Sequence, residues 1–438
     1  MSIFRAYDIR GRYPSEINKE IAFKIGSAFG KFIKGKRIVV GCDARESSPD
    51  LKDAIMSGLF KAEKEIIDIG LSTTPMFYFA ANHLDADGGV MITASHLGPE
   101  FNGLKLVESG GLSLTYDTGI GTIEKIVEKE KYEPENYEVT KKDVKEDYLK
   151  FLINKRINIK GKIVVDTGNG MMGLVIKDVL KRIGIEYKGL YLDVDCSFPN
   201  HEANPLKEET LNELKKTVVK EKALLGIAFD GDGDRIGIVN EMGEVVPGDF
   251  LIALIAKNIL KRGPAKILYD LRSSKIVPEV ITGMGGTPVK SRVGHSFISR
   301  RMKEEDIEFG GELSGHFYFK KTFYVESSIL ALINILELVS ETGEKLSELV
   351  KPLEKYYKSG EINFEVNNKE RKLKEIERVY REKGAKIEKI DGITVEFENW
   401  WFNLRPSNTE DLIRLNLEAK TKELMEEKLE EVEKIIKA

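Results

Sequence analysis

The chain has 438 residues, 41% of them hydrophobic, so it is too long for a single hydrophobic core and predicts three or four domains. Its 68 Lys and Arg nearly balance its 72 Asp and Glu, and the formal net charge of -4 excludes a broad basic surface for nucleic acid. The two cysteines, Cys42 and Cys196, lie in separate regions, which excludes a disulfide framework and fits a reducing compartment.

The first part of the chain alternates helices and strands. Hydrophobic periodicity predicts helices over 20–32, 49–60 and 75–82 and strands over 37–42, 66–69 and 90–92. This alternation is typical of a mostly parallel sheet with helices on its faces. The run 128–147 is charged and lacks apolar periodicity, so we interpret it as a solvated connector after the first domain.

Two further units repeat this arrangement, and a last segment differs from them. The second unit has predicted strands over 162–166, 225–229 and 236–240 and a helix that ends near 183. The third has predicted helices over 250–260, 276–282, 327–339 and from about 296, with strands over 267–269 and 287–290. In the last segment, alternating strands over 393–397 and 412–417 lie between amphipathic helices near 369–381 and 422–436.

These patterns predict an α/β protein of four domains around a central cleft. Three similar mixed-sheet α/β domains would span residues 1–140, 141–240 and 241–350, and a smaller C-terminal α+β domain would span 351–438. Each of the first three units carries a Gly-rich polar motif after a short apolar strand, and we expect the three loops to face one cleft.

The motif of the first unit lies in the stretch 88–105, GGVMITASHLGPEFNGLK. A buried strand over 90–92 would deliver Ser95 to the carboxyl end of the sheet, where ligands collect in open α/β folds. Its hydroxyl is a candidate nucleophile, and an ordinary surface turn is the alternative. Histidine titrates near neutral pH, so His96 and His295 are candidates for proton transfer or phosphate contact, with structural loop histidines as the alternative.

The motif of the second unit is acidic. Asp230, Asp232 and Asp234 alternate with glycines, so a flexible backbone lets three carboxylates face one point, where a hard divalent cation such as Mg²⁺ would offset their repulsion. A calcium loop is the rival interpretation, because Glu241 lies where such a loop places its last carboxylate. Arg235, however, occupies a position that the calcium loop requires to be glycine. A solvated acidic turn is the simplest alternative, and we predict one Mg²⁺ site.

Two later loops carry groups suited to a phosphorylated sugar. Glu312, Ser314 and His316 lie between glycines, and their side chains can hydrogen-bond adjacent hydroxyl groups. The segment 405–409, RPSNT, offers a guanidinium, two hydroxyls, an amide and loop N–H groups, a set suited to a phosphate dianion. Each loop alone could instead be a structural turn.

The sequence also bears on location. The amino-terminal segment MSIFRAYDIRGRY lacks the apolar core of a signal peptide, and no apolar run approaches the roughly 20 residues that cross a bilayer. We therefore expect a cytoplasmic protein that acts on neither membrane nor nucleic acid.

The order and spacing of the motifs resemble the α-D-phosphohexomutase superfamily, and most of all its phosphomannomutase/phosphoglucomutase branch. The match spans all four expected domains and rests on RAYDIRG at 5–11, TASHxxPEFNGxK at 93–105, DGDGDR at 230–235, GELSGH at 311–316 and RPSNTE at 405–410. The resemblance implies an isomerase that interconverts the 6-phosphate and 1-phosphate of mannose, glucose or both. It implies a phosphoserine enzyme and a hexose 1,6-bisphosphate that serves as intermediate and activator.

The resemblance further implies a role for each motif. Ser95 would carry the phosphoryl group and bind Mg²⁺ together with the three aspartates. The implied catalytic residues are Ser95, Lys105, His295, Arg10, Arg235 and His96, with Lys105 and His295 as general acid/base candidates. The implied substrate-binding residues are Glu312, Ser314, His316, Arg272, Arg405, Ser407, Asn408 and Thr409.

Three features depart from the family pattern. The serine loop usually continues with Asn-Pro after the histidine, whereas this chain has Leu97-Gly98, and Asp411 replaces a proline. Arg272 stands where some members have lysine, so we expect it to position substrate and not to transfer protons.

Other functions stay open at this point. A phosphoglucosamine mutase is the nearest one, although such enzymes more often carry Gln at the position of Leu313. A Mg-dependent sugar-phosphate phosphatase and a noncatalytic sugar-phosphate binder are alternatives of another class. Both monomer and homo-oligomer are compatible with the sequence.

Overall fold

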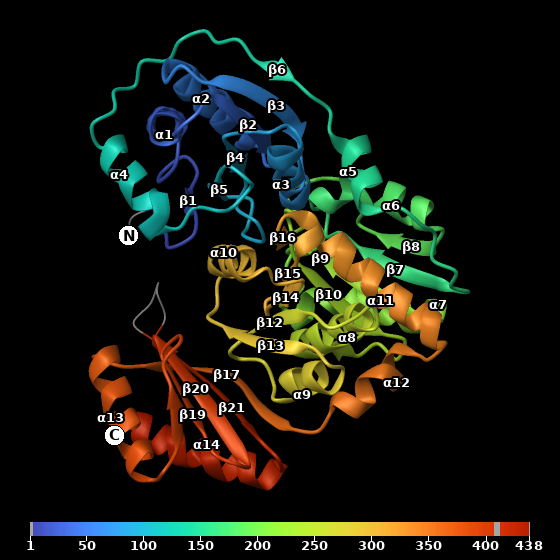
Figure 1. Cartoon of the computed structure of the whole chain (residues 1–438). Coiled ribbons are helices and arrows are strands. Elements are labelled where there is room, and N and C mark those ends of the chain that lie inside the picture. The colour runs from blue at the N-terminus through green and yellow to red at the C-terminus, as the bar shows by residue number, and fades with distance from the viewer. Residues whose placement is uncertain (1–2, 407–411, 438) are drawn as a thin grey trace.

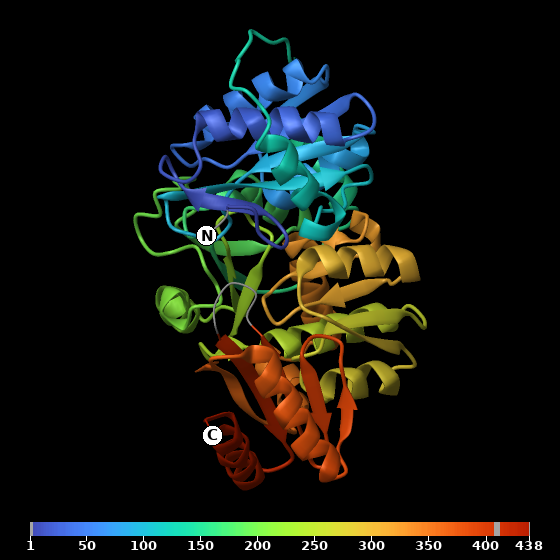
Figure 2. The ribbon, with the colours of Figure 1, turned by 90° about the vertical axis from the view of Figure 1, so that its left-hand side faces the viewer.

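The structure, a computed structural model, describes residues 3–406 and 412–437, and these form four units, each built around one β-sheet. Figures 1 and 2 show the first and fourth units at opposite ends of the molecule, with the second and third between them. Three units have mixed α/β sheets and the fourth is a smaller α+β unit, so the predicted fold class is confirmed. Within the described residues, no helix is both long and apolar enough to cross a membrane.

The first sheet has the strand order β1-β5-β4-β2-β3-β6. Its strands are β1 (Ile9–Arg12), β2 (Arg37–Cys42), β3 (Glu65–Leu71), β4 (Gly88–Ile92), β5 (Phe101–Glu108) and β6 (Thr140–Lys141). Its helices are α1 (Lys19–Phe32), α2 (Ser48–Lys61), α3 (Thr74–His83) and α4 (Gly121–Val127). Helices α1 and α2 pack so closely that a Cβ atom at Gly58 would lie 2.1 Å from the carbonyl oxygen of Phe23. This contact therefore requires glycine.

The charged run 128–147 is only partly the solvated connector that we expected. It passes over the outside of the first unit (Figure 1), but Glu130 turns back to α1 and accepts hydrogen bonds from Ser27 Oγ at 2.7 Å and Lys31 Nζ at 2.5 Å. Within the same run, β6 pairs with β3 and helix α5 (Lys145–Leu152) begins. These features could not be predicted from hydrophobic periodicity, because hydrogen bonds and ion pairs between polar residues leave no apolar pattern in the sequence.

The second and third units follow along the chain. The second contains β7 (Lys162–Asp166), β8 (Glu186–Leu190), β9 (Leu225–Phe229), β10 (Ile236–Asn240), β11 (Val245–Val246), α6 (Ile176–Ile183) and α7 (Asn212–Glu221). The third contains β12 (Lys266–Asp270), β13 (Thr287–Ser291), β14 (Phe309–Gly311), β15 (Phe317–Phe319), β16 (Val325–Glu326), α8 (Gly248–Leu260), α9 (Ile276–Gly283), α10 (His295–Glu305), α11 (Ser328–Thr342) and α12 (Leu346–Val350).

These three sheets share one connectivity, which fixes the location of the motifs. In each, one strand (β2, β7 or β12) lies between two parallel neighbours, and one of these neighbours leads through a loop into an antiparallel strand: β4 to β5, β9 to β10, and β14 to β15. The loops are 93–100, 230–235 and 312–316, so the three predicted motifs occupy equivalent positions. Each follows the carboxyl end of a parallel strand, where α/β folds place their ligands.

The fourth unit is an antiparallel sheet with the order β17-β21-β20-β19-β18. It contains β17 (Tyr357–Glu365), β18 (Lys386–Glu388), β19 (Ile393–Glu396), β20 (Trp400–Pro406), β21 (Leu412–Ala419), α13 (Lys369–Glu382) and α14 (Lys422–Lys437). Ion pairs join it to the third unit, among them Lys358 Nζ with Asp249 Oδ2 at 2.6 Å and Lys290 Nζ with Glu388 Oε2 at 2.8 Å.

Candidate active site

The three equivalent loops meet the amino-terminal segment at one cavity of about 1040 Å³. Nine of the residues predicted from the sequence line it: Arg10, Ser95, Lys105, Asp234, Arg235, His295, Glu312, Ser314 and His316. Strand β1 supplies Arg10 because it pairs with β5, where Arg10 lies opposite Gly103. The expected shared cleft is therefore present, and its wall comes from three sheets.

Ser95 adopts an unusual backbone conformation. Its φ of 53° is in the left-handed region, which costs a non-glycine residue on the order of 1 kcal/mol. The hydroxyl donates a hydrogen bond to Asp230 Oδ2 at 2.9 Å and lies 3.3 Å from His96 Nδ1. The two loops approach so closely that a Cβ atom at Gly231 would lie 2.3 Å from the carbonyl oxygen of Ser95. This contact requires glycine and holds Ser95 beside the acidic loop.

Arg45, which the sequence interpretation missed, organises the serine loop. Its guanidinium is buried and donates to the carbonyl oxygens of Ser95, Leu97, Gly98 and Phe101 at 2.6–3.1 Å. The sequence did not reveal this role, because no local pattern indicates a partner fifty residues along the chain. The carbonyl groups of Leu97 and Gly98, the two residues that depart from the family pattern, thus accept hydrogen bonds from this one side chain.

The acidic triad lies directly behind Ser95. Asp230, Asp232 and Asp234 are buried, and their carboxylate oxygens lie within 4.8 Å of one another. Asp232 Oδ2 accepts hydrogen bonds from Thr74 Oγ1 at 2.6 Å and Lys105 Nζ at 2.7 Å. The other oxygen, Asp232 Oδ1, is buried and has no hydrogen-bond partner among the residues that the structure describes. A hard cation with oxygen ligands would satisfy this atom, so the donor set fits Mg²⁺.

Burial and mutual repulsion dominate the electrostatics of Asp230, the triad member beside Ser95. Burial, then the charges of Asp234 and Asp232, raise the pKa of Asp230 well above its usual range. Burial alone would lower the pKa of Lys105, but Asp232 and Asp234 outweigh it and raise that pKa well above its ordinary value. Lys105 Nζ also lies 2.5 Å from Asp234 Oδ2, so its ammonium neutralises part of the triad's charge.

The calcium-loop alternative does not fit the structure. Glu241 accepts a hydrogen bond from Ser347 Oγ at 2.5 Å, away from the triad, and the flanking elements β9 and β10 are strands. An EF-hand would have helices there.

His96 is half-buried beside Ser95. Burial, followed by the charges of Arg235 and Arg10, lowers the pKa of His96 to about 2. The imidazole is therefore neutral at physiological pH, with one ring nitrogen that can donate a hydrogen bond and one that can accept.

The loop 312–316 interlocks with the acidic loop. Glu312 Oε1 accepts a hydrogen bond from the backbone N of Gly294 at 2.9 Å, and Glu312 Oε2 accepts one from Tyr318 OH at 2.6 Å. His316 lies 2.8 Å from Ser314 Oγ through Nδ1 and 3.3 Å from Arg235 Nε through Nε2. These contacts orient the side chains of the predicted sugar-binding loop toward the cavity.

Glu326 is a second residue that the sequence interpretation missed. It is buried in β16, and its Oε1 lies 3.2 Å from His295 Nδ1. A carboxylate at this distance from an imidazole can fix the orientation of the ring. Glu326 is the fifteenth residue after Gly311 at the start of GELSGH, and no short motif contains it.

Arg272 and Arg405 lie outside the Ser95 cavity. Both guanidinium groups approach Glu361 Oε2, Arg405 Nη2 at 3.1 Å and Arg272 Nη1 at 3.8 Å. Arg272 lines a neighbouring cavity of about 430 Å³ between the third and fourth units, and Ser314 lines both cavities. Ser407, Asn408 and Thr409 lie outside the described residues, so their predicted contact with phosphate stays a prediction.

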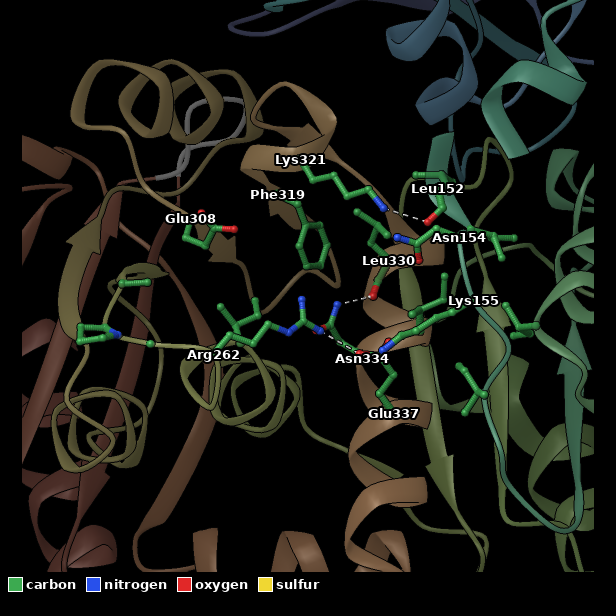
Figure 3. Close-up of a pocket in the computed structure, with 18 residues that line it drawn as sticks. Leu152, Asn154, Lys155, Arg262, Glu308, Phe319, Lys321, Leu330, Asn334 and Glu337 are labelled. Carbon is green, nitrogen blue, oxygen red and sulfur yellow. Dashed lines mark hydrogen bonds and ion pairs between the residues drawn. The ribbon is translucent and has the colours of Figure 1, made fainter. Parts of the chain in front are cut away.

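A third cavity, of about 550 Å³, has a different character (Figure 3). Several of its charged groups have partners inside the protein: Arg262 Nη2 and Lys155 Nζ each lie 2.9 Å from an oxygen of Glu337, and Lys321 Nζ donates to the carbonyl oxygen of Leu152 at 2.9 Å. None of the residues predicted to form the active site lines it. Its polar groups join the second unit to the third.

Comparisons with known proteins cover all four units of the chain. Family models described as phosphoglucomutase/phosphomannomutase match the chain in all four parts: domain I over residues 1–134, domain II over 142–243, domain III over 247–357 and the C-terminal domain over 361–435. A phosphomannomutase of Methanocaldococcus jannaschii is 42% identical over 442 residues, which cover 100% of this chain and 98% of the relative.

Solved structures give the same result. A phosphoglucomutase/phosphomannomutase family protein from Burkholderia thailandensis superposes with a TM-score of 0.93 at 29% identity, covering 100% of this chain and 97% of that one. An N-acetylphosphoglucosamine mutase of Aspergillus fumigatus, solved with GlcNAc-6P and magnesium, has a TM-score of 0.62 at 14% identity and covers 98% of this chain and 94% of that one. The second likeness concerns the fold alone.

Proposed function

Because the chain belongs to the phosphoglucomutase/phosphomannomutase family and is a hexose phosphate mutase, we propose that Ser95 carries the phosphoryl group which it transfers. One observation carries this proposal: a serine hydroxyl on the wall of the cavity lies 2.9 Å from a carboxylate of a buried acidic triad. We further propose that the sugar is mannose or glucose, since the 42% identical relative is a phosphomannomutase.

In the forward step, the free hydroxyl of a hexose phosphate attacks the phosphorus of phosphoserine 95. A P–O bond to the sugar forms, the P–O bond to Ser95 Oγ breaks, the attacking hydroxyl gives up its proton, and Oγ gains one. Lys105 and His295 both line the cavity and are the candidates for these proton transfers. The product is a hexose 1,6-bisphosphate, which turns end for end and returns its other phosphoryl group to Ser95.

The acidic triad is the proposed metal site. Asp230, Asp232 and Asp234, together with the phosphoserine, would hold one Mg²⁺. When bound, the cation would neutralise negative charge on the phosphoryl group during transfer. The magnesium in the Aspergillus fumigatus structure supports this choice of ion.

The remaining predicted residues would bind the sugar phosphate. Glu312, Ser314 and His316 would contact sugar hydroxyls, while Arg10 and Arg235 would lie near phosphoserine. Arg405, with the residues that follow it, would hold the phosphate that does not react. Since Arg405 lies outside the Ser95 cavity, the fourth unit must approach the first when substrate binds, and this closure would also exclude water.

A comparison of Ser95→Ala with Ser27→Ala tests the role of the serine. Ser27 is also buried in the first unit, where it donates to Glu130, so the control loses a buried serine hydroxyl away from the site. We expect turnover to fall by several orders of magnitude in Ser95→Ala only, with both proteins folded. Near-normal turnover by Ser95→Ala would exclude the phosphoserine route.

Two further assays separate the alternatives. Mannose, glucose and glucosamine 1-phosphates should be compared in the presence of catalytic hexose bisphosphate, and turnover of the glucosamine compound alone would overturn the proposed sugar. Inorganic phosphate should be measured at the same time. A phosphatase would release it as fast as substrate disappears, whereas a mutase conserves it.

A further inference from the structure

We propose that Arg45 is the positioning residue of the phosphoryl-transfer serine. The inference rests on the proposed role of Ser95 and adds a residue that touches neither the cavity nor the predicted substrate contacts. Arg45 is 1% exposed and is among the largest fully buried side chains of the described chain. The N–H groups of a buried guanidinium need hydrogen-bond acceptors, and the acceptors present show which part of the structure the side chain holds in place.

Arginine offers five N–H donors, and all five can be assigned here. Nε donates to Asp43 Oδ2 at 2.9 Å. Nη1 donates to the carbonyl oxygens of Gly98 at 2.6 Å and Phe101 at 3.1 Å. Nη2 donates to those of Ser95 at 3.0 Å and Leu97 at 2.8 Å. Three of the five donors therefore hold the loop 93–100, one of them through Ser95 itself, and a fourth holds Phe101, the first residue of β5.

The turn that carries Arg45 is anchored to both strands that flank this loop. The backbone N of Asp43 donates to the carbonyl oxygen of Ile92 at the end of β4, at 2.9 Å. Asn102 Nδ2, in β5, donates to Ser47 Oγ at 2.8 Å and Ser48 Oγ at 3.0 Å. The guanidinium thus has a fixed position relative to the strands, and the loop takes its position from the guanidinium.

This arrangement explains how Ser95 stays in its strained conformation. A residue with φ of 53° relaxes unless its surroundings determine its backbone, and the bond from Arg45 to the Ser95 carbonyl supplies one such constraint. Transfer of a phosphoryl group requires the oxygen, the phosphorus and the attacking hydroxyl to lie nearly in line, so an error of about 1 Å in the serine can cost roughly 100-fold in rate.

Two substitutions separate geometry from charge. Arg45→Lys keeps the positive charge but not the planar five-donor group, and Arg45→Met removes both at similar length. Lys52→Met is the matched control: Lys52 Nζ lies 3.0 Å from both carboxylate oxygens of Asp68, so this change removes a partly buried ion pair of the same unit that does not touch the serine loop. All four proteins are assayed as full chains, well below their unfolding temperatures.

We expect Arg45→Lys and Arg45→Met to lower kcat by roughly 100-fold while KM changes by less than about threefold, because the predicted substrate contacts lie in other loops. Affinity for glucose 1-phosphate, measured by calorimetry, should also stay within about threefold of the wild-type value. Lys52→Met should keep its kcat even if its unfolding temperature falls.

The following results would overturn the proposal. One is an Arg45→Lys protein that is folded and has a kcat within about threefold of wild type; another is a kcat loss that merely follows the unfolding temperature in all three variants. If neither Arg45 variant folds, nitrogen-15 NMR of the wild type decides, since it should show one arginine whose guanidinium protons exchange slowly and whose Nη groups do not rotate freely. Absence of that signal refutes the proposal. A fully active Ser95→Ala would instead refute the proposed function, which distinguishes the two failures.

Discussion

Replacement of Asp232 by asparagine tests the acidic triad most sharply. Asparagine has nearly the same shape, so its oxygen can still accept from Thr74 Oγ1 and Lys105 Nζ, which now lie 2.6 and 2.7 Å from Asp232 Oδ2. Its amide nitrogen would then take the place of Oδ1, the buried oxygen without a hydrogen-bond partner among the described residues. An N–H donor pointed at a cation site repels the cation, and the triad loses one negative charge.

The expected magnitude follows from linkage. Loss of groups that only orient a metal ligand typically weakens affinity 10- to 100-fold, so the loss of a ligand itself should cost about 100-fold or more. Mg²⁺ at 100 times the wild-type Kd stabilises the folded wild type by about 2.7 kcal/mol. At the same concentration, a variant with 100-fold weaker affinity gains only about 0.4 kcal/mol.

Unfolding should therefore be followed with and without Mg²⁺ for wild type, Asp232→Asn and the control Asp193→Asn. The Asp193 side chain is 97% exposed, so the control removes the same charge from the same unit without touching the triad. We expect the Mg²⁺-dependent stabilisation to fall from about 2.7 to about 0.4 kcal/mol in Asp232→Asn alone. If Asp232→Asn keeps the wild-type gain, the assignment of the metal site is wrong.

Three further predictions concern other parts of the chain. Arg405→Lys should raise KM for hexose phosphates about tenfold, because lysine cannot bind phosphate through two parallel N–H groups; an unchanged KM in steady-state kinetics would contradict the predicted phosphate contact. Glu326→Gln should lower kcat at least about tenfold with little change in KM, since the variant loses the carboxylate that lies 3.2 Å from His295 Nδ1 and orients the ring, and equal kcat values would exclude this role. A hydrogen bond to Asp166 raises the pKa of His201, so the stability lost in His201→Asn should be largest below about pH 6.5 and should shrink as pH rises through the folded-state pKa. Denaturant unfolding of both proteins at about pH 5.5 and about pH 9 tests this, and a stability difference that grows with pH refutes it.

Much of the fold follows from local patterns. The strands β9 and β10 begin and end at the predicted residues, because each is a short apolar run and the polar, Gly-rich segment 230–235 separates them. The helix predicted up to residue 183 is correct only from Ile176, since Met171–Leu174 form a 3-10 turn. The limits predicted for the four domains stay predictions.

The site was predictable where one motif holds several groups together. Asp230, Asp232 and Asp234 alternate with glycines, and this spacing alone lets the backbone bring their carboxylates together. Arg45 and Glu326 were not predictable, because each acts on a residue that lies in another motif. Their roles depend on strand order, which places the turn of Arg45 beside the serine loop and β16 beside α10, and no local period in the sequence encodes that order.

The central claim is that Ser95 carries the phosphoryl group, and one measurement tests it directly. The intact mass of the protein should be measured before and after phosphatase treatment, and again after incubation with a hexose 1,6-bisphosphate and Mg²⁺, with the modified peptide then sequenced by mass spectrometry. We predict that phosphatase removes, and the bisphosphate restores, the mass of one phosphoryl group, located at Ser95. A phosphoryl group on any other residue, or none in an active enzyme, would contradict the proposed mechanism.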